Sequence, residues 1–464
     1  MKDSVFRQYD IRGIIGSEFD ITKAYDLGLA IAYRLKELKP TARTCVIGYD
    51  GRETSKPIAD ALIQAMRASG FDVTSIGLCA TPVLYFARHD KNFDVGLMVT
   101  ASHNPKEYNG IKICVDDRPV WGDDVQIIKR YFHENRALSA SPGTYTDQSV
   151  NAEYVAWLVN HFSDLKSYNA DCVIDCGNGT TGPLVTALIE AMGWQNVSVL
   201  FSEVDGTFPH HNADPIIPEN MRFVKDVLSS SSHQCGIGFD GDGDRMSIMT
   251  RAGKLIPGDV LLGLFATELS LNSSVIYDVK SSLALVHWIR SLQLNGYFSP
   301  SGHSLIHTLM REKNALLGGE FSCHFFFADD YFGYDDGVYA MLRFMRLIRR
   351  NGKTADQLYA EFPSYNSSPE IRIPCLEPNK KRILRDLEQY FLQRDDCCEI
   401  MTLDGIRVSM PYGWALVRVS NTQPMLSARF ESQTVSGLQA IKRDVISVLD
   451  HFFDHDVLVK AFNT

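Results

Sequence analysis

The sequence lacks the features of a membrane, secreted or nucleic-acid-binding protein. No apolar run approaches the roughly 20 residues that span a bilayer, and the first residues, Met1–Ser4, carry no signal-peptide core. Basic residues are outnumbered, with 46 Lys and Arg against 56 Asp and Glu, which gives a net charge of −10. Binding to a nucleic-acid backbone needs a basic surface. We therefore expect a cytoplasmic protein whose partners include neither a membrane nor nucleic acid.

Paired metal-binding cysteines are also missing. Of the ten cysteines, Cys172 and Cys176 are spaced unlike a zinc knuckle, and Cys397 and Cys398 are adjacent. Most of the others fall in strand-like or helical stretches. This distribution predicts reduced thiols in the cytosol rather than a disulfide framework.

At 464 residues the chain is too long for one hydrophobic core. Strands alternate with helices up to residue 362, as in the strand 45–49 and the helix that begins near Ser55, which favours α/β domains. Stretches rich in Ser, Pro and small polar residues at 137–149 and 363–369 indicate breaks. The sequence after 369 has short strands and a final amphipathic helix, which favours a small α+β domain. The predicted fold is three related mixed α/β domains plus a C-terminal α+β domain, with limits at residues 1–147, 148–250, 251–364 and 365–464.

The loop Thr100–Pro105 follows an apolar strand at 95–99 and has Ser102 at its centre. Ligands of parallel α/β sheets bind at the carboxyl ends of the strands. Small Ala101 and titratable His103 flank Ser102, so we expect an accessible hydroxyl among polar groups and take His103 as a candidate catalytic group. Ser102 lacks the Gly-x-Ser-x-Gly pattern of a serine hydrolase. Taken alone, the hexapeptide is also typical of an ordinary turn.

Asp240, Asp242 and Asp244 alternate with glycines after a second strand, at 236–239. Carboxylates this close repel one another unless a cation holds them, and glycine lets the loop curl until all three face one point. An EF-hand needs Gly at its sixth position and Glu at its twelfth, where this chain has Arg245 and Arg251. The pattern predicts a divalent metal site, with Mg²⁺ favoured over a calcium loop.

Two more polar loops lie further along the chain. Gly319–His324 combines a carboxylate, a hydroxyl and an imidazole, and Glu320 and Ser322 suit hydrogen bonds to adjacent sugar hydroxyls. Arg418 precedes hydroxyl and amide side chains at 420–423, a composition that suits a phosphate group. Each loop alone is equally compatible with a structural turn.

Together these motifs resemble the α-D-phosphohexomutase superfamily, most closely its bacterial phosphomannomutase/phosphoglucomutase branch. The resemblance covers essentially the whole chain and is carried, in order, by Phe6–Gly13, Thr100–Pro105, Tyr108–Lys112, Asp240–Arg245, Gly302–Ser304, Gly319–His324 and Arg418–Thr422. It implies a heart-shaped protein whose fourth domain closes over a central active-site cleft. It also implies a mutase that interconverts hexose 6-phosphate and hexose 1-phosphate through a phosphoserine and a hexose 1,6-bisphosphate intermediate. Such a reaction supplies precursors of nucleotide sugars and polysaccharides.

The resemblance further implies roles for single residues. Ser102 carries the phosphoryl group and, once phosphorylated, ligates Mg²⁺ beside Asp240, Asp242 and Asp244. Sugar hydroxyls meet Glu320 and Ser322, and the non-reacting phosphate meets Arg418, Ser420, Asn421 and Thr422. The groups around the transferred phosphoryl are Arg12, Lys112, Arg245, His303 and His324, and further substrate contacts are Tyr9 and Lys280. The expected partners are hexose phosphates, with a hexose 1,6-bisphosphate as activator, and the expected assembly is a monomer or weak homodimer.

The sugar loop departs from the family pattern at one position. Cys323 replaces a glycine, and because cysteine tolerates positive φ poorly, we expect a different backbone beside His324. Phe321 offers no donor or acceptor for a sugar substituent at C2, which favours mannose and glucose phosphates together. A phosphoglucosamine mutase is the alternative within the superfamily. A phosphatase with Asp240 or Asp242 as nucleophile is the alternative outside it, and it leaves Ser102 without a role.

Overall fold

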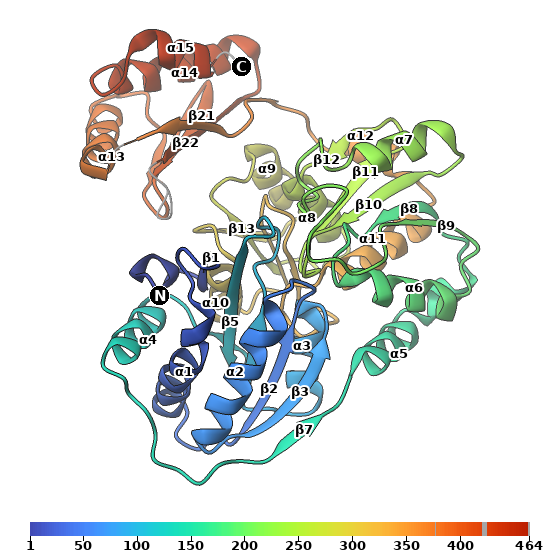
Figure 1. Ribbon diagram of the computed structural model, residues 1–464. Coiled ribbons are helices and arrows are strands. Elements are labelled where there is room, and N and C mark those ends of the chain that lie inside the picture. The colour runs from blue at the N-terminus through green and yellow to red at the C-terminus, as the bar shows by residue number, and fades with distance from the viewer. Residues whose placement is uncertain (376, 420–424, 463–464) are drawn as a thin grey trace.

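The computed structural model describes residues 1–375, 377–419 and 425–462. Four sheets with their own helices follow one another along the chain, and the α/β character of the first three and the α+β character of the last are as predicted (Figure 1). Among the described residues, no helix is both long enough and apolar enough to cross a bilayer. The predicted fold class is confirmed.

The first sheet has the strand order β1-β5-β4-β2-β3-β7, with β6 paired to β5. Its strands are β1 (Ile11–Ile14), β2 (Thr44–Tyr49), β3 (Asp72–Leu78), β4 (Val95–Val99), β5 (Tyr108–Val115), β6 (Arg118–Pro119) and β7 (Tyr145–Asp147). Its helices are α1 (Ala24–Leu38), α2 (Ser55–Ala68), α3 (Thr81–Asp90) and α4 (Asp123–His133), with short 3-10 turns at Asp3–Val5 and Ile21–Lys23. The strand β7 lies inside the stretch predicted as a linker, because the open edge of β3 pairs with it.

The second sheet has the order β12-β11-β10-β8-β9, and the third has the order β14-β13-β15-β16. The second segment contains α5 (Asn151–His161), a 3-10 turn at Ser163–Ser167, β8 (Asp171–Asp175), α6 (Thr181–Met192), β9 (Asn196–Leu200), α7 (Arg222–Ser230), β10 (Cys235–Phe239), β11 (Met246–Thr250) and β12 (Leu255–Ile256). The third contains α8 (Gly258–Ala266), β13 (Ser274–Asp278), α9 (Leu283–Ser291), β14 (Asn295–Ser299), α10 (His303–Lys313), β15 (Leu317–Gly319), β16 (Phe325–Phe327), α11 (Gly337–Asn351) and α12 (Ala355–Glu361).

The first three segments share one topology that fixes where their loops lie. Each contains three parallel strands and then an antiparallel fourth, in the spatial orders β3-β2-β4-β5, β9-β8-β10-β11 and β14-β13-β15-β16. The loop between the third and fourth strand therefore occupies an equivalent place in each sheet. These three loops hold Ser102, the Asp240–Asp244 run and the Glu320–His324 run. The repeated fold thus places the Ser102 hydroxyl, the three aspartates and the polar Glu320–His324 run at corresponding strand ends.

The fourth segment is built differently. Its sheet has the order β17-β22-β21-β20-β19, with β18 also paired to β22, and the pairings are antiparallel. Its elements are β17 (Asn366–Ser367), β18 (Ile371–Pro374), α13 (Glu377–Leu392), β19 (Glu399–Met401), β20 (Ile406–Met410), β21 (Gly413–Val419), β22 (Met425–Ser432), α14 (Val435–Leu449) and α15 (His455–Phe462). In Figure 1 this segment stands to one side of the other three.

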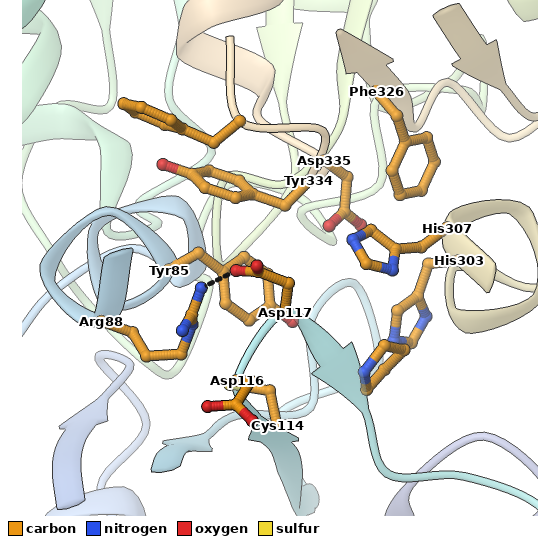
Figure 2. Close-up of a pocket in the computed structure, with 12 residues that line it drawn as sticks. Tyr85, Arg88, Cys114, Asp116, Asp117, His303, His307, Phe326, Tyr334 and Asp335 are labelled. Carbon is orange, nitrogen blue, oxygen red and sulfur yellow. Dashed lines mark hydrogen bonds and ion pairs between the residues drawn. The ribbon is translucent and has the colours of Figure 1, made fainter. Parts of the chain in front are cut away.

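A small pocket lies between the first and third segments (Figure 2). The first segment contributes Tyr85, Arg88 and Cys114, among others, and the third contributes His303, His307 and Asp335. Arg88 is paired with Asp117 on the pocket's rim. His303 and Asp335 line this pocket on the side of the third segment.

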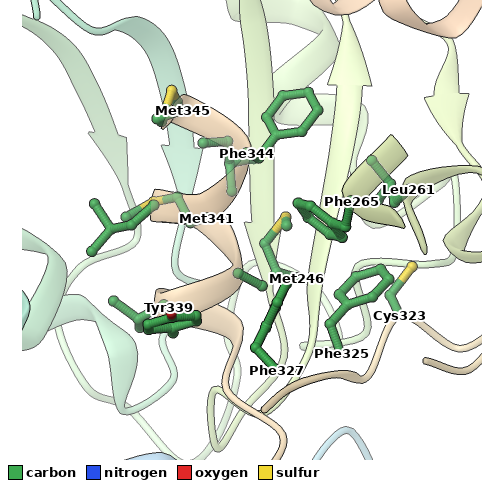
Figure 3. Packing of buried hydrophobic residues seen from close by; sticks show 14 of the residues in the cluster. Met246, Leu261, Phe265, Cys323, Phe325, Phe327, Tyr339, Met341, Phe344 and Met345 are labelled. Carbon is green, nitrogen blue, oxygen red and sulfur yellow. The ribbon is translucent and has the colours of Figure 1, made fainter. Parts of the chain in front are cut away.

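The largest hydrophobic core joins the first three segments, whereas the fourth has its own core. Figure 3 shows part of the large core, where Met246 of β11, Phe265 of α8 and Phe327 of β16 pack beside α11. Between the third and fourth segments there is a small cluster of Val279, Trp414 and Leu416. Burial of apolar surface contributes most of the energy that holds domains together. The first three segments therefore form one body, and the fourth is attached more lightly.

Asp336, the N-cap of α11, joins the second and third segments through a buried polar contact. Its carboxylate accepts hydrogen bonds from the hydroxyls of Tyr154 of α5, at 2.8 Å, and of Tyr331, at 2.6 Å.

Tyr154→Phe leaves this buried carboxylate with one donor fewer. We expect the substitution to lower the free energy of unfolding by about 2 kcal/mol, measured as a lower denaturant midpoint. Tyr145→Phe, at a half-exposed ring on β7, is the matched control. Equal midpoints for the two variants would contradict the assigned contact.

Candidate active site

Ser102 lies in a buried loop that turns its hydroxyl toward the second segment. Its Oγ donates to Asp240 Oδ2 at 2.6 Å and lies 3.2 Å from His103 Nδ1. The backbone of Ser102 has φ +51°, in the left-handed region that serine rarely adopts. Its amide donates to Thr100 Oγ1 at 2.9 Å. A strained backbone held by specific bonds is typical of a functional loop.

The Asp240–Asp244 loop brings three fully buried carboxylates together beside Lys112 of β5. Asp242 Oδ2 accepts from Lys112 Nζ at 2.7 Å and from Thr81 Oγ1 at 2.6 Å. Asp244 Oδ2 also accepts from Lys112 Nζ, while Asp240 Oδ1 accepts from the Arg245 amide at 3.1 Å. The loop between β10 and β11 therefore packs directly against the loop between β4 and β5.

Burial and mutual repulsion give the three aspartates different pKa values. Burial, together with the charges of Asp244 and Asp242, raises the pKa of Asp240 well above its ordinary value. Burial also raises the pKa of Asp244, but Lys112, His324 and Arg245 outweigh it, and the pKa lies below the ordinary value. Such a cluster is costly to keep charged without a cation.

The donor set fits a divalent metal ion. One oxygen each of Asp240, Asp242 and Asp244 can face a common point, with all three atoms within 4.8 Å of one another. The buried Oδ1 atoms of Asp242 and Asp244 have no hydrogen-bond partner among the described residues. A second group of Asp244, His324 and Asp335 meets the same distance condition. An all-carboxylate set suits a hard ion such as Mg²⁺ better than a set that contains an imidazole.

Arg245 and His324 connect the second and third segments beside the metal-type cluster, which is Asp240, Asp242 and Asp244. Arg245 Nε donates to His324 Nε2 at 2.9 Å, which requires that nitrogen to be unprotonated. The other ring nitrogen, Nδ1, lies 2.9 Å from Asp335 Oδ2 and 3.5 Å from Asp244 Oδ1. Burial lowers the pKa of His324, and its ring is therefore held neutral in one tautomer.

Arg12 and His303 lie on the same edge of the fold. Arg12 of β1 pairs with Asp10 and donates to Asn104 Oδ1 at 2.7 Å and to the Ala101 carbonyl at 3.2 Å, so it borders the serine loop. The ring of His303, at the start of α10, lies 6.1 Å from that of His324. Burial lowers the pKa of His303 to about 4. Arg12 thus borders the serine loop, and His303 lies near His324.

The candidate sugar-binding groups form an adjacent cluster. Glu320 is buried, its Oε1 accepts from the Gly302 amide at 2.6 Å, and burial and Asp278 raise its pKa. The Tyr9 ring packs on Gly302, where a Cβ atom would lie 2.9 Å from Tyr9 Cε1. Lys280 Nζ lies 3.8 Å from Asp278 Oδ2. Ser322 follows on the same loop and is partly exposed.

The expectation about Cys323 was wrong. Cys323 adopts φ +66°, so it keeps the left-handed conformation that a glycine would take at this place. Its side chain is buried in the core beside Phe265 and Phe325, and this packing offsets the backbone strain (Figure 3). The backbone therefore turns at Cys323, and His324 reaches Arg245.

Arg418 of β21 is the described part of the candidate phosphate-binding loop. Its guanidinium pairs with Asp404 Oδ2 at 2.6 Å, and Asp404 also accepts from the Ser301 amide at 3.1 Å. The predicted contacts Ser420, Asn421 and Thr422 lie outside the described residues. Asp404 thus holds Arg418 next to the loop before α10.

Polar contacts attach the fourth segment to the third. Arg407 donates to the carbonyls of Val279 at 2.5 Å and Ser281 at 3.0 Å. Arg429 donates to the Lys280 carbonyl, and its guanidinium carbon lies 3.9 Å from the centre of the Phe321 ring. Phe321, the variable residue of the sugar loop, therefore packs against the fourth segment.

Sequence analysis missed the residues that support these groups. They are Asp50, Arg52 and Thr100 under the serine loop, Thr81 on Asp242, Asp335 beside His324, and Asp404 on Arg418. A signal existed for Asp50 and Arg52, because they follow β2, which is the parallel neighbour of β4. Side chains at the carboxyl ends of neighbouring parallel strands lie close together. The other contacts depend on how separate segments pack.

Family models match the whole run of segments. They are described as phosphoglucomutase/phosphomannomutase alpha/beta/alpha domain I, at residues 3–138, domain II, at 152–253, domain III, at 257–365, and the C-terminal domain, at 370–448.

Similar proteins cover the chain almost completely. A phosphomannomutase/phosphoglucomutase of Pseudomonas aeruginosa is 36% identical over 443 residues, which are 95% of this chain and 94% of that protein. A phosphoglucomutase of Neisseria gonorrhoeae is 34% identical, with 96% of each chain covered. The crystal structure of a phosphoglucomutase/phosphomannomutase family protein from Burkholderia thailandensis superposes with a TM-score of 0.89 at 34% identity, and covers 97% of this chain and 98% of its own.

Proposed function

Because this chain belongs to the phosphoglucomutase/phosphomannomutase family, we propose that Ser102 is the phosphoryl carrier of a hexose phosphate mutase reaction. The enzyme is a phosphohexomutase that interconverts hexose 6-phosphate and hexose 1-phosphate, with mannose or glucose as the sugar. The observation that carries the assignment of Ser102 is its buried hydroxyl, 2.6 Å from Asp240, at the meeting point of two topologically equivalent loops.

The reaction passes one phosphoryl group from Ser102 to the free end of the substrate. The attacking sugar hydroxyl loses its proton, the new P–O bond forms, and the bond to Ser102 Oγ breaks, which gives the hexose 1,6-bisphosphate. After the bisphosphate turns over, its other phosphoryl group returns to Ser102. Lys112, Arg12 and Arg245 supply positive charge around this transfer, which depends mainly on positioning and charge stabilisation.

We propose that Asp240, Asp242 and Asp244 hold Mg²⁺ and that the oxygens of phosphorylated Ser102 complete the site. When bound, the ion supplies positive charge that stabilises the negative charge on the transferring group. The Oδ1 atoms of Asp242 and Asp244, which accept no hydrogen bond from the described residues, support this assignment. His303, with its pKa lowered to about 4, is neutral near pH 7 and can accept the proton of the sugar hydroxyl.

Glu320, Ser322, Tyr9 and Lys280 are proposed to contact the sugar, and Arg418 with Ser420, Asn421 and Thr422 to bind the non-reacting phosphate. A closing motion over the substrate is supported by the separate core of the fourth segment, which meets the third through a small apolar cluster and through arginine–carbonyl bonds. A phosphate site on a moving domain accepts either end of the bisphosphate as it reorients.

We further propose that segments 1–147, 148–250, 251–364 and 365–464 act as phosphoserine, metal, sugar and phosphate domains. We also propose that the protein is a monomer or weak homodimer. The ten cysteines, all of them among the described residues, are thiols, and eight of them are buried, which supports a reducing, cytoplasmic location.

Ser102→Ala removes the phosphoryl acceptor and leaves the surrounding packing intact. We expect turnover of hexose phosphates to fall below about 1% of the parent value, because covalent transfer through the serine is lost. Intact-mass analysis after incubation with a hexose 1,6-bisphosphate should show one added phosphoryl group in the parent only. Ser141→Ala, at an exposed position of the segment before β7, is the control. Near-normal turnover of Ser102→Ala with added bisphosphate would overturn the assignment.

The sugar preference follows from the loop that contains Glu320 and Phe321. Mannose and glucose present the same 3- and 4-hydroxyls, and the Phe321 ring offers no hydrogen bond to a substituent at C2. A site without a specific bond at a position discriminates weakly there. We expect kcat/KM values for mannose 1-phosphate and glucose 1-phosphate to agree within about tenfold, or 1.4 kcal/mol, and both to exceed that for glucosamine 1-phosphate. The glucosamine alternative has less support from the similar proteins, and a tenfold preference for that sugar would establish it instead.

A further inference from the structure

Arg52 is a buried cation beneath the serine loop that has no part in the chemistry assigned above. It follows β2, and its side chain is 1% exposed. Its Nε donates to Asp50 Oδ2 at 3.1 Å. The remaining bonds go to four backbone carbonyls, those of Pro105 at 2.7 Å, Tyr108 at 3.1 Å, Ser102 at 2.8 Å and Asn104 at 2.6 Å. A guanidinium has five N–H groups, so every donor is used.

These bonds hold the loop on both sides of its strained residue. The carbonyl of Ser102 itself is one of the acceptors, and Ser102 has φ +51°. On the other side, the Ser102 amide donates to Thr100 Oγ1, whose hydroxyl donates to Asp50 Oδ2 at 2.8 Å. Asp50 and Arg52 therefore fix both the amide and the carbonyl of Ser102. With its backbone fixed, the Ser102 side chain faces Asp240.

The second segment covers Arg52 with an aromatic ring. Phe208 lies over the guanidinium, with 5.1 Å between the guanidinium carbon and the ring centre. A Cβ atom added at Gly241 would lie 3.4 Å from Phe208 Cζ and 2.7 Å from the Ser102 carbonyl oxygen. Backbone contact is also close at Gly206, where a Cβ atom would lie 2.4 Å from Arg52 Cα. Phe208 thus packs between Arg52 and the loop that carries the aspartates.

We propose that Arg52 is a positioning residue that sets the direction of the Ser102 hydroxyl toward the metal-type cluster, and that Phe208 locks the guanidinium in place. The inference rests on the proposed role of Ser102. A displacement of about 1 Å at a reacting group lowers a rate by about two orders of magnitude. The loop therefore needs a rigid support that lies outside the reacting groups.

Arg52→Lys is the sharpest test because it keeps the positive charge and removes the planar guanidinium with its five N–H donors. An ammonium group donates from one point and cannot reach four carbonyls on both sides of a loop. We expect kcat to fall by about 30- to 100-fold while KM for the hexose phosphate changes by less than about threefold. The single-turnover rate of Ser102 phosphorylation by glucose 1,6-bisphosphate, followed by intact mass, should fall by the same factor as kcat.

Arg343→Lys is the matched control for a purely structural loss. Arg343 is also buried, its guanidinium donates two hydrogen bonds to Asp329 at 2.9 Å, and it contacts the Phe327 ring. It lies on α11 and touches none of the proposed reacting groups. We expect this variant to lose stability and keep its kcat. Phe208→Leu is a second, milder variant. We expect it to lower kcat by about five- to tenfold and to leave KM unchanged. It tests the proposal if Arg52→Lys does not fold.

The outcomes separate this inference from the proposed function. If the parent is not phosphorylated on Ser102, the proposed function fails and this inference fails with it. If the parent is phosphorylated and both Arg52→Lys and Phe208→Leu match its rate, only the positioning role is overturned. Equal kcat losses in Arg52→Lys and Arg343→Lys would also overturn it, because they would indicate a general loss of stability.

Discussion

Asp240, Asp242 and Asp244 repel one another within a site that water barely reaches. Coulomb repulsion grows as the surroundings become less polar, and here three carboxylates are fully buried within 4.8 Å of one another. Lys112 compensates part of that charge, and Arg245 lies on the far side. A bound cation, as proposed above, would offset the remaining charge, and the proposed phosphoryl carrier Ser102 faces the same cluster.

The fold meets this requirement by repetition. Three sheets place the loop between their third and fourth strands at equivalent positions, and the first three segments share one continuous core. The loops are therefore held rigidly relative to one another, as the geometry of phosphoryl transfer demands. The fourth segment has a separate core and a contact surface rich in arginine and carbonyl groups. The proposed phosphoryl-transfer groups and the proposed phosphate-binding residue Arg418 thus lie in parts of the chain that have separate cores.

Much of this arrangement was predictable from sequence, and the reasons are local. Apolar strands that end in polar loops identified the Ser102 and Asp240–Asp244 loops, and local sequence patterns identified the start of α2 and the amphipathic helix α14. The supporting residues were only partly predictable. Asp50 and Arg52 follow β2, the parallel neighbour of β4, and this placed them near the serine loop. The bond from Arg52 to the Ser102 carbonyl, 50 residues away, and the pairing of Asp404 with Arg418 depend on how the chain packs. Cys323 shows that the preference of a residue type for negative φ does not by itself decide the backbone conformation. Burial among Phe265 and Phe325 offsets a conformation that its residue type disfavours.

The position of the metal tests the central claim most directly, because two candidate groups share Asp244. Crystals of the phosphorylated enzyme soaked in Mn²⁺ would show the ion by its anomalous scattering. The account predicts one peak bounded by Asp240, Asp242 and Asp244, with an oxygen of phosphorylated Ser102 as a further ligand. A peak at Asp244, His324 and Asp335, or no peak beside Ser102, would contradict it.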